Sequence, residues 1–419
     1  MKIDVMTKDK DTKTVVPALR FPEFRDGEGW VETTLKSISP SIFDGTHQTP
    51  KYTEVGVPFY SVENIVSGNK NKFISEDDHK IATLKNCPAK GDILITRIGT
   101  IGFSKVVDWN FDFSIYVTLA VVKKSDHFIS NFLHQYFQSS IYQSEILSKS
   151  LLDAVPCKIN MDELRNTRIF LPPDKEKKEQ AKIAGFLGSL DDLISAVADK
   201  IETLKEYKKG LMQQLFPAEG KTIPAIRFPE FQNAGEWKDT TLGEEVYYEN
   251  GKAHENDINE TGKYIVVNSK FISTDGEVVK YTDNPSCLAN KGDILMVLSD
   301  VPNGRAIAKC FIVDCNNKYT VNQRVCKLTP KKAVALLLYY SINRNPFLLA
   351  FDDGIKQTNL KKDDVLNCLF RLPQEPQEQQ RIADCLLSVD ELISTEIAKL
   401  DQLKAHKKGL MQQLFPKLQ

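Results

Sequence analysis

Hydrogen-bonding and basic side chains gather in one short stretch near the start of the chain. The segment DGTHQTPKY (Asp44–Tyr52) places His47, Gln48 and Lys51 among turn-forming glycine, threonine and proline. Glutamine can form paired hydrogen bonds with adenine, and lysine can contact guanine or a phosphate. The stretch therefore predicts a loop that binds base edges or another polyanion, with an ordinary solvated loop as the alternative.

Similar polar and basic stretches recur in both halves of the chain. They are GNKNK (68–72) and CKIN (157–160) in the first half, and ENGKAH (249–254), VPNGR (301–305), VNQR (321–324) and IKQTNLKK (355–362) in the second. Each one alone is explained by a solvated loop, but together they favour a polyanionic ligand. The residues predicted to contact it are His47, Gln48, Lys51, Tyr52, Lys70, Lys72, Arg97, Thr100, Lys252, His254, Asn303, Arg305, Gln323, Arg324, Lys356 and Gln357.

The common sequence motifs of catalysis and metal binding are missing from the chain. The chain contains no GxxxxGK[ST], HExxH or GxSxG motif. PPDKEKKEQ superficially matches a nuclease carboxylate–lysine pattern, but its setting indicates a solvated helix start. NPF (Asn345–Phe347) lacks the second proline of an amino-methyltransferase motif and is interpreted as a turn. The sequence predicts neither a catalytic nor a metal site.

Composition is that of an ordinary soluble protein. Of 419 residues, 41% are hydrophobic and 26% are charged, and the net charge is −1. No apolar run approaches the roughly 18 residues that span a bilayer, and the polar start lacks a signal-peptide core. The eight cysteines form no CxxC pair, so we expect reduced thiols in a cytoplasmic protein. A polyanion-binding surface would require local segregation of charge.

The chain also contains a tandem duplication. The decapeptide KKGLMQQLFP occurs at Lys208–Pro217 and again at Lys407–Pro416. The match extends backward without a gap, so that 23 of the 39 residues from Glu179 to Pro217 recur 199 positions later. VPALRFPEF at residue 16 returns as IPAIRFPEF at residue 223, and KGDILI returns as KGDILM. A unit of about 200 residues is too long for a solenoid repeat and suits a domain with a connector.

Long helices are predicted over the duplicated ends. Apolar residues follow alternating steps of four and three from Ile183 to Leu215 and from Ile382 to Leu414. Lys208 interrupts the first seam, and Glu396 and Lys407 interrupt the second. Each stretch begins after prolines and stops at Phe-Pro. We expect the two copies to pair as an antiparallel coiled coil, the alternative being helices packed only on their own domains.

The remaining segments predict two mixed α/β (α+β) domains. Short β-branched runs such as GDILITRIGTIGFSKVV alternate with turn residues, and helical patches lie near each domain's end. The predicted organisation is a domain at 1–173, a helix at 174–217, a second domain at 218–373 and a second helix at 374–419. The halves share their frame but differ in loop residues, which predicts two binding specificities.

These features resemble a known family. The helices ending KKGLMQQLFP after LP…EQxxIA, with segments such as FDGTHQTPKY and GDILITRIGTIG, are similar to the specificity subunit of type I restriction–modification systems. The resemblance covers essentially the whole chain. It implies two target-recognition domains, each reading half of a split, asymmetric double-stranded DNA target, and no catalysis on this chain.

The resemblance also implies partners. Two methyltransferase subunits, carrying S-adenosylmethionine, would dock on the helices, and two motor–endonuclease subunits would bring ATP and Mg²⁺; this chain itself would hold no cofactor. The residues predicted to flank the docking seam are Lys208, Gln213, Gln214, Lys407, Gln412 and Gln413. The alternatives are the specificity subunit of a related system that fuses methylation and cutting, and a coiled-coil scaffold that binds protein.

Overall fold

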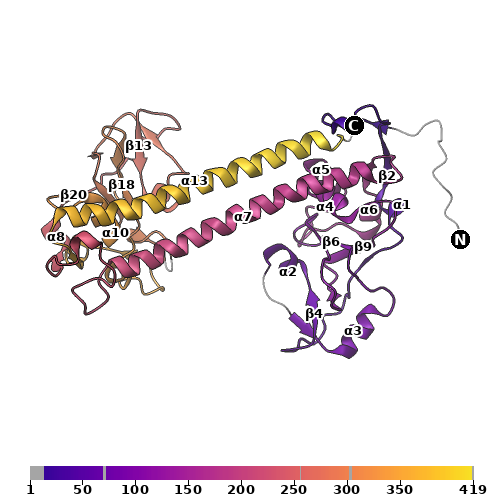
Figure 1. The fold of residues 1–419 in the computed structure, drawn as a ribbon, viewed down its shortest axis with the longest axis horizontal. Helices are drawn as coiled ribbons and strands as arrows, with labels where there is room; N and C mark the ends of the chain where they lie inside the picture. Colours follow the sequence, from indigo (N-terminus) through magenta and orange to yellow (C-terminus); the bar gives the residue numbers. More distant parts are fainter. Residues whose placement is uncertain (1–13, 69–71, 255, 302–303, 418–419) are drawn as a thin grey trace. The chain divides into compact units, whose positions relative to one another are not determined.

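Packing divides the chain into two compact units. The computed structural model describes residues 14–68, 72–254, 256–301 and 304–417 (Figure 1). The first unit consists of Met1–Asp199 with Ile397–Gln419, and the second of Lys200–Glu396. Both divisions fall inside the long helices α7 (Lys178–Leu215) and α13 (Pro376–Leu414). Each unit therefore combines one globular domain with part of each helix.

The described residues in the globular part of the first unit form three small sheets. Their strand orders are β1 (Thr14–Val15)–β2 (Trp30–Thr34)–β10 (Arg168–Leu171), β3 (Ile42–Asp44)–β9 (Leu119–Val122)–β6 (Ile93–Thr96)–β7 (Ser104–Val106), and β5 (Lys72–Ile74)–β4 (Val57–Tyr60)–β8 (Ser114–Ile115). The helices are α1 (Leu35–Ile38), α2 (Val62–Ser67), α3 (Glu76–Thr83), α4 (Ser130–Gln138), α5 (Ser140–Ser148) and α6 (Met161–Arg165), with a 3-10 turn at Pro22–Phe24. Strands β6 and β9 are buried throughout, as expected for apolar runs covered on both faces.

The second unit repeats the four-stranded sheet of the first. Its sheets are β12 (Val246–Asn250)–β20 (Val325–Pro330)–β16 (Ile294–Val297)–β18 (Cys310–Ile312), β14 (Tyr281–Thr282)–β13 (Tyr264–Val267)–β19 (Tyr319–Val321)–β15 (Leu288–Ala289), β11 (Lys238–Thr241)–β22 (Leu369–Leu372), and β17 (Ser299–Asp300)–β21 (Thr358–Asn359). The helices are α8 (Leu242–Glu245), α9 (Ser269–Ser273), α10 (Ala335–Ile342), α11 (Pro346–Leu349) and α12 (Lys362–Leu366), with a 3-10 turn at Pro229–Phe231.

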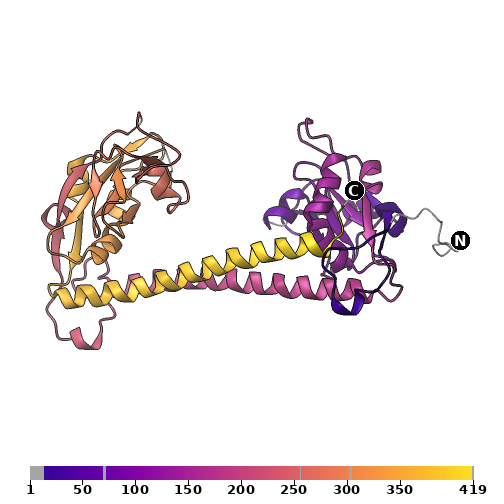
Figure 2. The same cartoon turned by 90° about the horizontal axis from the view of Figure 1, so that it is seen from above.

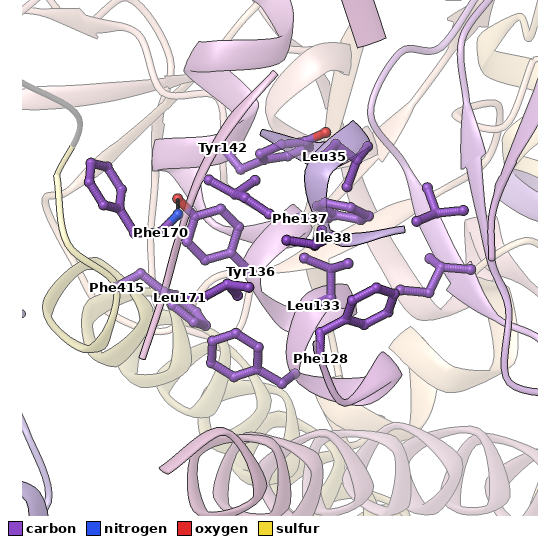
Figure 3. Close-up of a cluster of buried hydrophobic side chains, with 14 of the residues drawn as sticks. Leu35, Ile38, Phe128, Leu133, Tyr136, Phe137, Tyr142, Phe170, Leu171 and Phe415 are labelled. Carbon is purple, nitrogen blue, oxygen red and sulfur yellow. Dashed lines mark hydrogen bonds between the residues drawn. The ribbon is translucent and has the colours of Figure 1, made fainter. Parts of the chain in front are cut away.

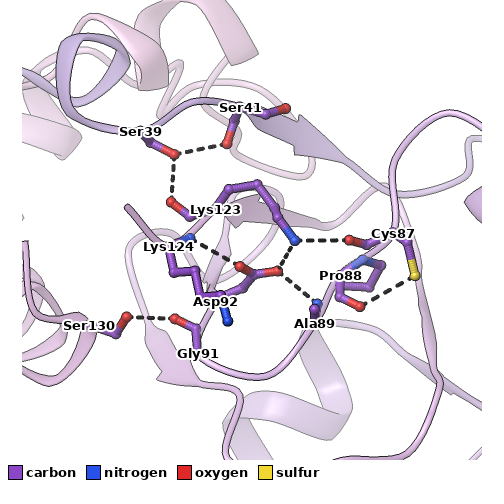
Figure 4. A network of polar contacts seen from close by, with 10 residues as sticks. All are labelled: Ser39, Ser41, Cys87, Pro88, Ala89, Gly91, Asp92, Lys123, Lys124 and Ser130. Atoms are coloured by element: carbon purple, nitrogen blue, oxygen red, sulfur yellow. Dashed lines mark hydrogen bonds and ion pairs between the residues drawn. The ribbon is translucent and has the colours of Figure 1, made fainter. Parts of the chain in front are cut away.

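The repeated KGDIL sequence forms the same turn in both units. Asp92 accepts hydrogen bonds from the amide of Ala89 (2.7 Å) and from Lys123 Nζ (2.6 Å), within the polar network of Figure 4. Asp293 likewise accepts from the amide of Asn290 (2.7 Å). The preceding glycines have φ of +89° and +91°, a left-handed conformation that glycine adopts without steric cost. The repeat is therefore a structural turn leading into β6 and β16.

The two long helices run antiparallel within each unit. Helices α7 and α13 contain 38 and 39 residues, and Figures 1 and 2 both show them side by side. In the second unit, Lys200 pairs with Glu396 and Lys208 pairs with Asp390, so residue numbers rise along one helix as they fall along the other. This confirms the predicted mixed α/β domains and antiparallel helix pair.

Ion pairs explain the charged interruptions of the heptad seam. Lys208 Nζ donates to both carboxylate oxygens of Asp390 at 2.6 and 2.7 Å. Lys407 Nζ donates to Asp191 at 2.5 Å in the first unit, and Glu396 accepts from Lys200. Each interrupting charge thus meets its opposite on the other helix. Such pairs can fix helix register.

The apolar half of each decapeptide completes a domain core. In the first unit, Met411 and Leu414 of the last turn of α13, and Phe415 directly after it, are buried in the main cluster. Figure 3 shows Phe415 among the other buried side chains. The Phe415 ring meets that of Trp30 at a centroid distance of 6.2 Å. In the second unit, Phe216 occupies the corresponding place at 5.9 Å from Trp237. The decapeptide occurs twice because each domain requires one helix end as part of its core.

A buried ion pair anchors the other repeated motif, RFPEF. Arg20 donates two hydrogen bonds of 2.7 Å to Glu179 near the start of α7. Arg227 does the same to Glu378 near the start of α13, at 2.7 and 2.6 Å. Bidentate pairing of this kind is strongly directional. Each domain is therefore fixed to the beginning of one long helix and the end of the other.

Candidate nucleic-acid interface

Three segments of the first unit converge on the residue that follows β6. Arg97 Nη1 donates to Asp44 Oδ2 and to the carbonyl of Val117, both at 3.0 Å. Its Nε donates to the carbonyl of Ile159 at 3.3 Å. Stretches near residues 44, 117 and 159 are thereby joined at one edge of the domain. We call the exposed parts of these stretches, with the 97–103 turn, the first edge.

Arg97 was predicted to contact the ligand, and the structure gives it an internal role. Only 7% of its surface is exposed, because its donors are directed at Asp44 and backbone carbonyls. Burial lowers the pKa of Arg97, and the Asp44 carboxylate opposes that shift. The residue was predicted to contact the ligand directly, whereas here it holds Asp44 at the start of the loop DGTHQTPKY.

The loop after β3 presents the predicted polar side chains to solvent. His47, Gln48 and Lys51 are exposed, and His47 Nε2 lies 3.2 Å from Asp44 Oδ2. Gly45 passes so close to the neighbouring strand that an added Cβ would lie 2.0 Å from the carbonyl oxygen of Ile115. A side chain at this position would displace the loop from the edge. Thr100 is also exposed, on the 97–103 turn.

Tyr52 and Lys72 meet beside a different sheet. Lys72 Nζ lies 5.2 Å from the centroid of the half-exposed Tyr52 ring, and the same amine is 3.3 Å from Glu63. The neighbouring Thr53 and Phe73 are joined by a β-bridge, so the pair belongs with β4 and β5. Lys70 lies outside the described residues. The structure thus separates these residues from those joined through Arg97.

The second unit builds a corresponding edge with different side chains. Leu298 follows β16 where Arg97 follows β6, and it makes the same two backbone contacts. Its amide donates to the carbonyl of Arg324 (2.9 Å) and its carbonyl accepts from Leu360 (2.8 Å), as Arg97 does with Thr118 and Ile159 (both 2.9 Å). An added Cβ on Gly251 would lie 2.1 Å from the carbonyl of Asn322, repeating the close approach of Gly45. The frame is kept while its side chains change.

Exposed polar side chains also gather along the second edge, which comprises residues 250–254, 298–301, 304–305, 321–325 and 355–360. The exposed members predicted from sequence are Lys252, Arg305, Gln323, Arg324, Lys356 and Gln357. Gln357 Nε2 donates to Ser299 Oγ at 2.7 Å, which orients its amide. Asn303 lies outside the described residues. Most of the second predicted set is therefore brought together.

His254 differs from this group because it is only 1% exposed. Its Nδ1 lies 2.7 Å from the carbonyl of Lys252, and its Nε2 lies 3.0 Å from Thr320 Oγ1. A ring held at both nitrogens inside the domain shapes the loop and does not reach a ligand in this structure. The sequence showed a polar residue in a polar loop but not the strand that covers it.

Two aspartates that support the edges were missed as functional residues. Asp44 holds Arg97 and His47, as described above. Asp300 accepts from the amides of Val301 (2.9 Å), Ala306 (2.6 Å) and Ile307 (3.1 Å). These bonds fold the loop that carries the exposed Arg305. The available signal was an acidic residue directly before a glycine- or proline-containing turn, which is a common turn-forming arrangement.

Charge on the two edges is locally positive despite the balanced composition. The exposed cations Lys51, Lys158, Lys252, Arg305, Arg324 and Lys356 form no ion pair with another described residue. By contrast, many cations elsewhere are paired with carboxylates, including Lys123, Lys208 and Lys407. Unpaired cations beside hydrogen-bonding loops suit a phosphate backbone with readable bases.

The predicted docking residues divide into two groups. Gln213, Gln214, Gln412 and Gln413 are exposed on the last turns of α7 and α13. Lys208 and Lys407 are engaged in the internal ion pairs described above. The exposed glutamines thus remain available to a partner at equivalent places in both units.

Neither a metal cluster nor a membrane span is found in the described parts of the chain. No group of three or more His, Cys, Asp or Glu side chains is placed to hold a metal ion there. Among the same residues, no helix combines the length and apolar character needed to cross a bilayer.

Comparison with known proteins identifies the family. A family model described as the type I restriction modification DNA specificity domain matches residues 27–206 and, a second time, residues 234–405. The chain belongs to this family. Each match contains one globular domain and most of one long helix, so the specificity-domain repeat is also the structural repeat. The predicted class, a DNA-specificity subunit of type I restriction–modification, is confirmed.

Known proteins of type I restriction–modification systems resemble the chain over most of its length. The type I restriction enzyme MjaVIII specificity subunit of Methanocaldococcus jannaschii is 25% identical over 379 residues, covering 85% of each chain. The S subunit structure from M. genitalium has a TM-score of 0.62 at 16% identity and covers 97% of this chain and 100% of that one. A chain from a structural study of type I complex assembly has a TM-score of 0.54 at 17% identity, covering 93% and 98%. These two likenesses confirm the fold.

Proposed function

We propose that this chain selects an asymmetric DNA target made of two half-sites, one read by each unit. The observation that carries the proposal is the equivalence of the two edges. Backbone contacts around Arg97 recur around Leu298, while the exposed side chains on those contacts differ. Such a backbone frame would hold the two reading surfaces in the same way, and the different side chains would give each surface its own sequence preference. The target-recognition domains would be residues 1–173 and 218–373.

Different residues on each edge would position and read the DNA. The unpaired cations, such as Lys158 and Arg324, would contact phosphates and set affinity. The amides of Gln48 and Gln357 can pair with adenine in the major groove, and His47 can donate to a base acceptor. Asp44 and Asp300 would act by holding these loops.

The helices would carry the partners of the complex. Exposed glutamines occur at equivalent places in both units, Gln213 and Gln214 in one and Gln412 and Gln413 in the other. Two equivalent sites support docking of two identical methyltransferase subunits, which would supply S-adenosylmethionine and flip the target adenine. Two motor–endonuclease subunits would add ATP- and Mg²⁺-dependent cutting. This chain would contribute recognition and assembly without catalysis.

Adenine-methylation mapping of the source genome, with and without this gene, tests the proposal. Deletion should abolish methylation at one split, asymmetric motif and leave other motifs unchanged. Exchange of residues 18–171 for the corresponding segment of a relative should then alter one half-site only. Persistence of every methylated motif, or simultaneous change of both half-sites, would contradict the proposal.

Salt dependence distinguishes DNA reading from a protein-binding scaffold. Phosphate contacts release counterions, so log K should fall linearly with log salt concentration, with a slope of about −0.9 per phosphate contact. Replacing Arg324 by alanine should reduce the magnitude of that slope by the amount expected for about one phosphate contact. If the chain does not bind DNA even at low salt, that result would favour the protein-binding scaffold.

A further inference from the structure

Strongly exposed aliphatic side chains project from both edges. Val155 is 100% exposed in the first unit, and Ile355 and Val301 are 77% and 65% exposed in the second. Leu151 and Leu152, which precede Val155, are 49% and 56% exposed. Single exposed apolar residues are ordinary on protein surfaces. Val155 and Ile355 are set apart by their place in the two frames and by the way their segments are held.

The segment carrying Val155 is a hairpin fixed to the first edge. Leu151 and Lys158 exchange two backbone hydrogen bonds of 2.7 and 3.2 Å. The carbonyl of Cys157 accepts from the amide of Gly99 at 2.8 Å, and Ile98 forms a β-bridge with Lys158. The hairpin Leu151–Lys158, called the first tip, thus starts from the Arg97 turn and holds Val155 beyond it.

The segment carrying Ile355 is a turn fixed to the second edge by other means. Asp353 Oδ1 accepts from the amides of Ile355 (2.9 Å) and Lys356 (3.1 Å). Asp352 Oδ1 accepts from the amide of Gly354 and from Thr358 Oγ1, both at 3.0 Å. Strand β21 pairs with β17 beside the Arg305 loop. The segment Asp352–Asn359, called the second tip, is therefore held at its edge by its own side chains.

The two tips share their place and their apolar apex but little of their sequence. LLDAVPCK and DDGIKQTN precede Ile159 and Leu360, the residues that make equivalent backbone bonds to Arg97 and Leu298. Unrelated turn chemistry thus presents an aliphatic group at the same place in each frame. An unrelated pair of solvated loops would be expected to expose polar residues there. The surrounding exposed side chains are mainly donors and cations, with one exposed carboxylate on each tip: Asp153 on the first, and Asp353, which accepts from its own turn, on the second. The same polyanionic ligand would therefore meet both tips.

We propose that Val155 and Ile355 make base-specific contacts with thymine 5-methyl groups, one in each half-site. This inference rests on the proposed reading of DNA by the two edges. In the major groove, thymine is the base that presents a methyl group, and apolar side chains recognise it by contact. Donors such as Gln48 read polar base edges, whereas the tips supply the apolar complement. Lys158, at the base of the first tip, and Lys356, next to Ile355 on the second, are placed to contact phosphates beside the same bases.

Replacement of thymine by uracil tests the contact because it removes only the methyl group. The full chain, assembled with its methyltransferase partner, is first used to select duplexes from a random-sequence pool. The selected duplex is then remade with deoxyuridine at each thymine in turn. Loss of one buried methyl contact should weaken binding roughly fourfold at one position in each half-site.

Matched variants then connect each position to its tip. Val155→Ser should reduce affinity by a similar factor and abolish the uracil effect in the first half-site only. Ile355→Ser should do so in the second only. Leu84→Ser is the control, because Leu84 is 83% exposed in the first unit and directly follows α3, which takes no part in the Arg97 side-chain contacts. The melting temperature of all three should equal that of the unaltered chain, since these side chains lie in solvent.

The outcomes separate this inference from the proposed function. Three results would overturn the tip contacts while leaving DNA selection intact. They are half-sites that contain no thymine, equal binding to thymine and uracil duplexes, and uracil sensitivity that persists in both serine variants. Failure of the assembled protein to enrich any sequence would overturn the proposed function itself.

Discussion

Lys208 of α7 and Asp390 of α13 form a two-bond ion pair in the second unit, and the pair recurs in the first unit with the helices exchanged. The partner residues there are Lys407 of α13 and Asp191 of α7. The lysines belong to identical decapeptides, and the aspartates also lie 199 residues apart. Tyr340 strengthens the Lys208–Asp390 pair by donating a hydrogen bond of 2.7 Å to Asp390. The duplicated sequence thus encodes both halves of each cross-helix pair.

Replacing Lys208 by alanine should lower the free energy of unfolding by about 2 kcal/mol. This value lies between those of exposed and buried ion pairs, because both side chains are partly shielded. Chemical denaturation would measure it. Lys209→Ala is the matched control, since Lys209 is exposed in the same decapeptide and should change stability little. Equal effects of the two variants would show that the ion pair does not stabilise the helices.

The identical decapeptides should differ in what their phenylalanines contribute. Phe415 is 1% exposed and packs with Trp30, Phe132 and Tyr136, so Phe415→Ala should cost about 4 kcal/mol. Phe216 is only partly buried, and Phe216→Ala should cost about 2 kcal/mol. Denaturation of each variant, with exposed Gln412→Ala as a control, measures the difference. A larger loss from Phe216→Ala would contradict the burial argument.

Sequence reasoning predicted the repeated architecture better than the roles of single residues. Heptad spacing and the duplicated ends were sufficient for the helix pair, because those signals are local. Arg97 and His254 were both predicted to contact the ligand, but their burial depends on Asp44 and Thr320, which arrive from distant strands. The core role of Phe415 was also hidden, because Trp30 lies almost four hundred residues earlier in the chain. Long-range packing decides which polar residue faces solvent and which apolar residue closes a core.

Removal of the Arg97 guanidinium should impair reading of one half-site. In Arg97→Met, Asp44 and the carbonyls of Val117 and Ile159 lose their donor, so the first edge should loosen. Unsatisfied buried acceptors should also lower stability by about 1–3 kcal/mol. Sequence selection by the assembled protein should show a degenerate first half-site and an unchanged second one. Arg324→Ala, in contrast, should weaken binding to all sequences if Arg324 contacts phosphate. A first half-site that is preserved in Arg97→Met would refute the role of Arg97 in supporting the first edge.

Acid should destabilise the first unit through His134 of α4. Burial lowers the pKa of His134 to about 4, and the nearby positive charge of Lys407 adds to the effect. The unfolded chain, with an ordinary histidine pKa near 6.5, binds the proton more readily. The contribution of His134 is therefore full above about pH 6.5 and is lost as pH falls toward 4.

Urea denaturation at pH 7.5 and pH 5.5 measures this effect. His134→Asn, which can still hydrogen-bond Ser104, should reduce the loss of stability between the two pH values. The exposed His127 provides the control, and His127→Asn should leave the pH dependence unchanged. An undiminished pH dependence in His134→Asn would assign acid sensitivity to other groups.

The helix pair should set the gap between the two half-sites. Seven residues inserted in each helix, after Asp199 and after Glu396, would retain the heptad seam and lengthen it by about 10.5 Å. This corresponds to about three base pairs of B-DNA. Methylation mapping or sequence selection should then return both original half-sites separated by a longer gap. Insertion in α7 alone is the control, because it shifts the cross-helix ion pairs out of register and should destabilise the chain. Original half-sites with the original gap would show that the helices do not determine the spacing.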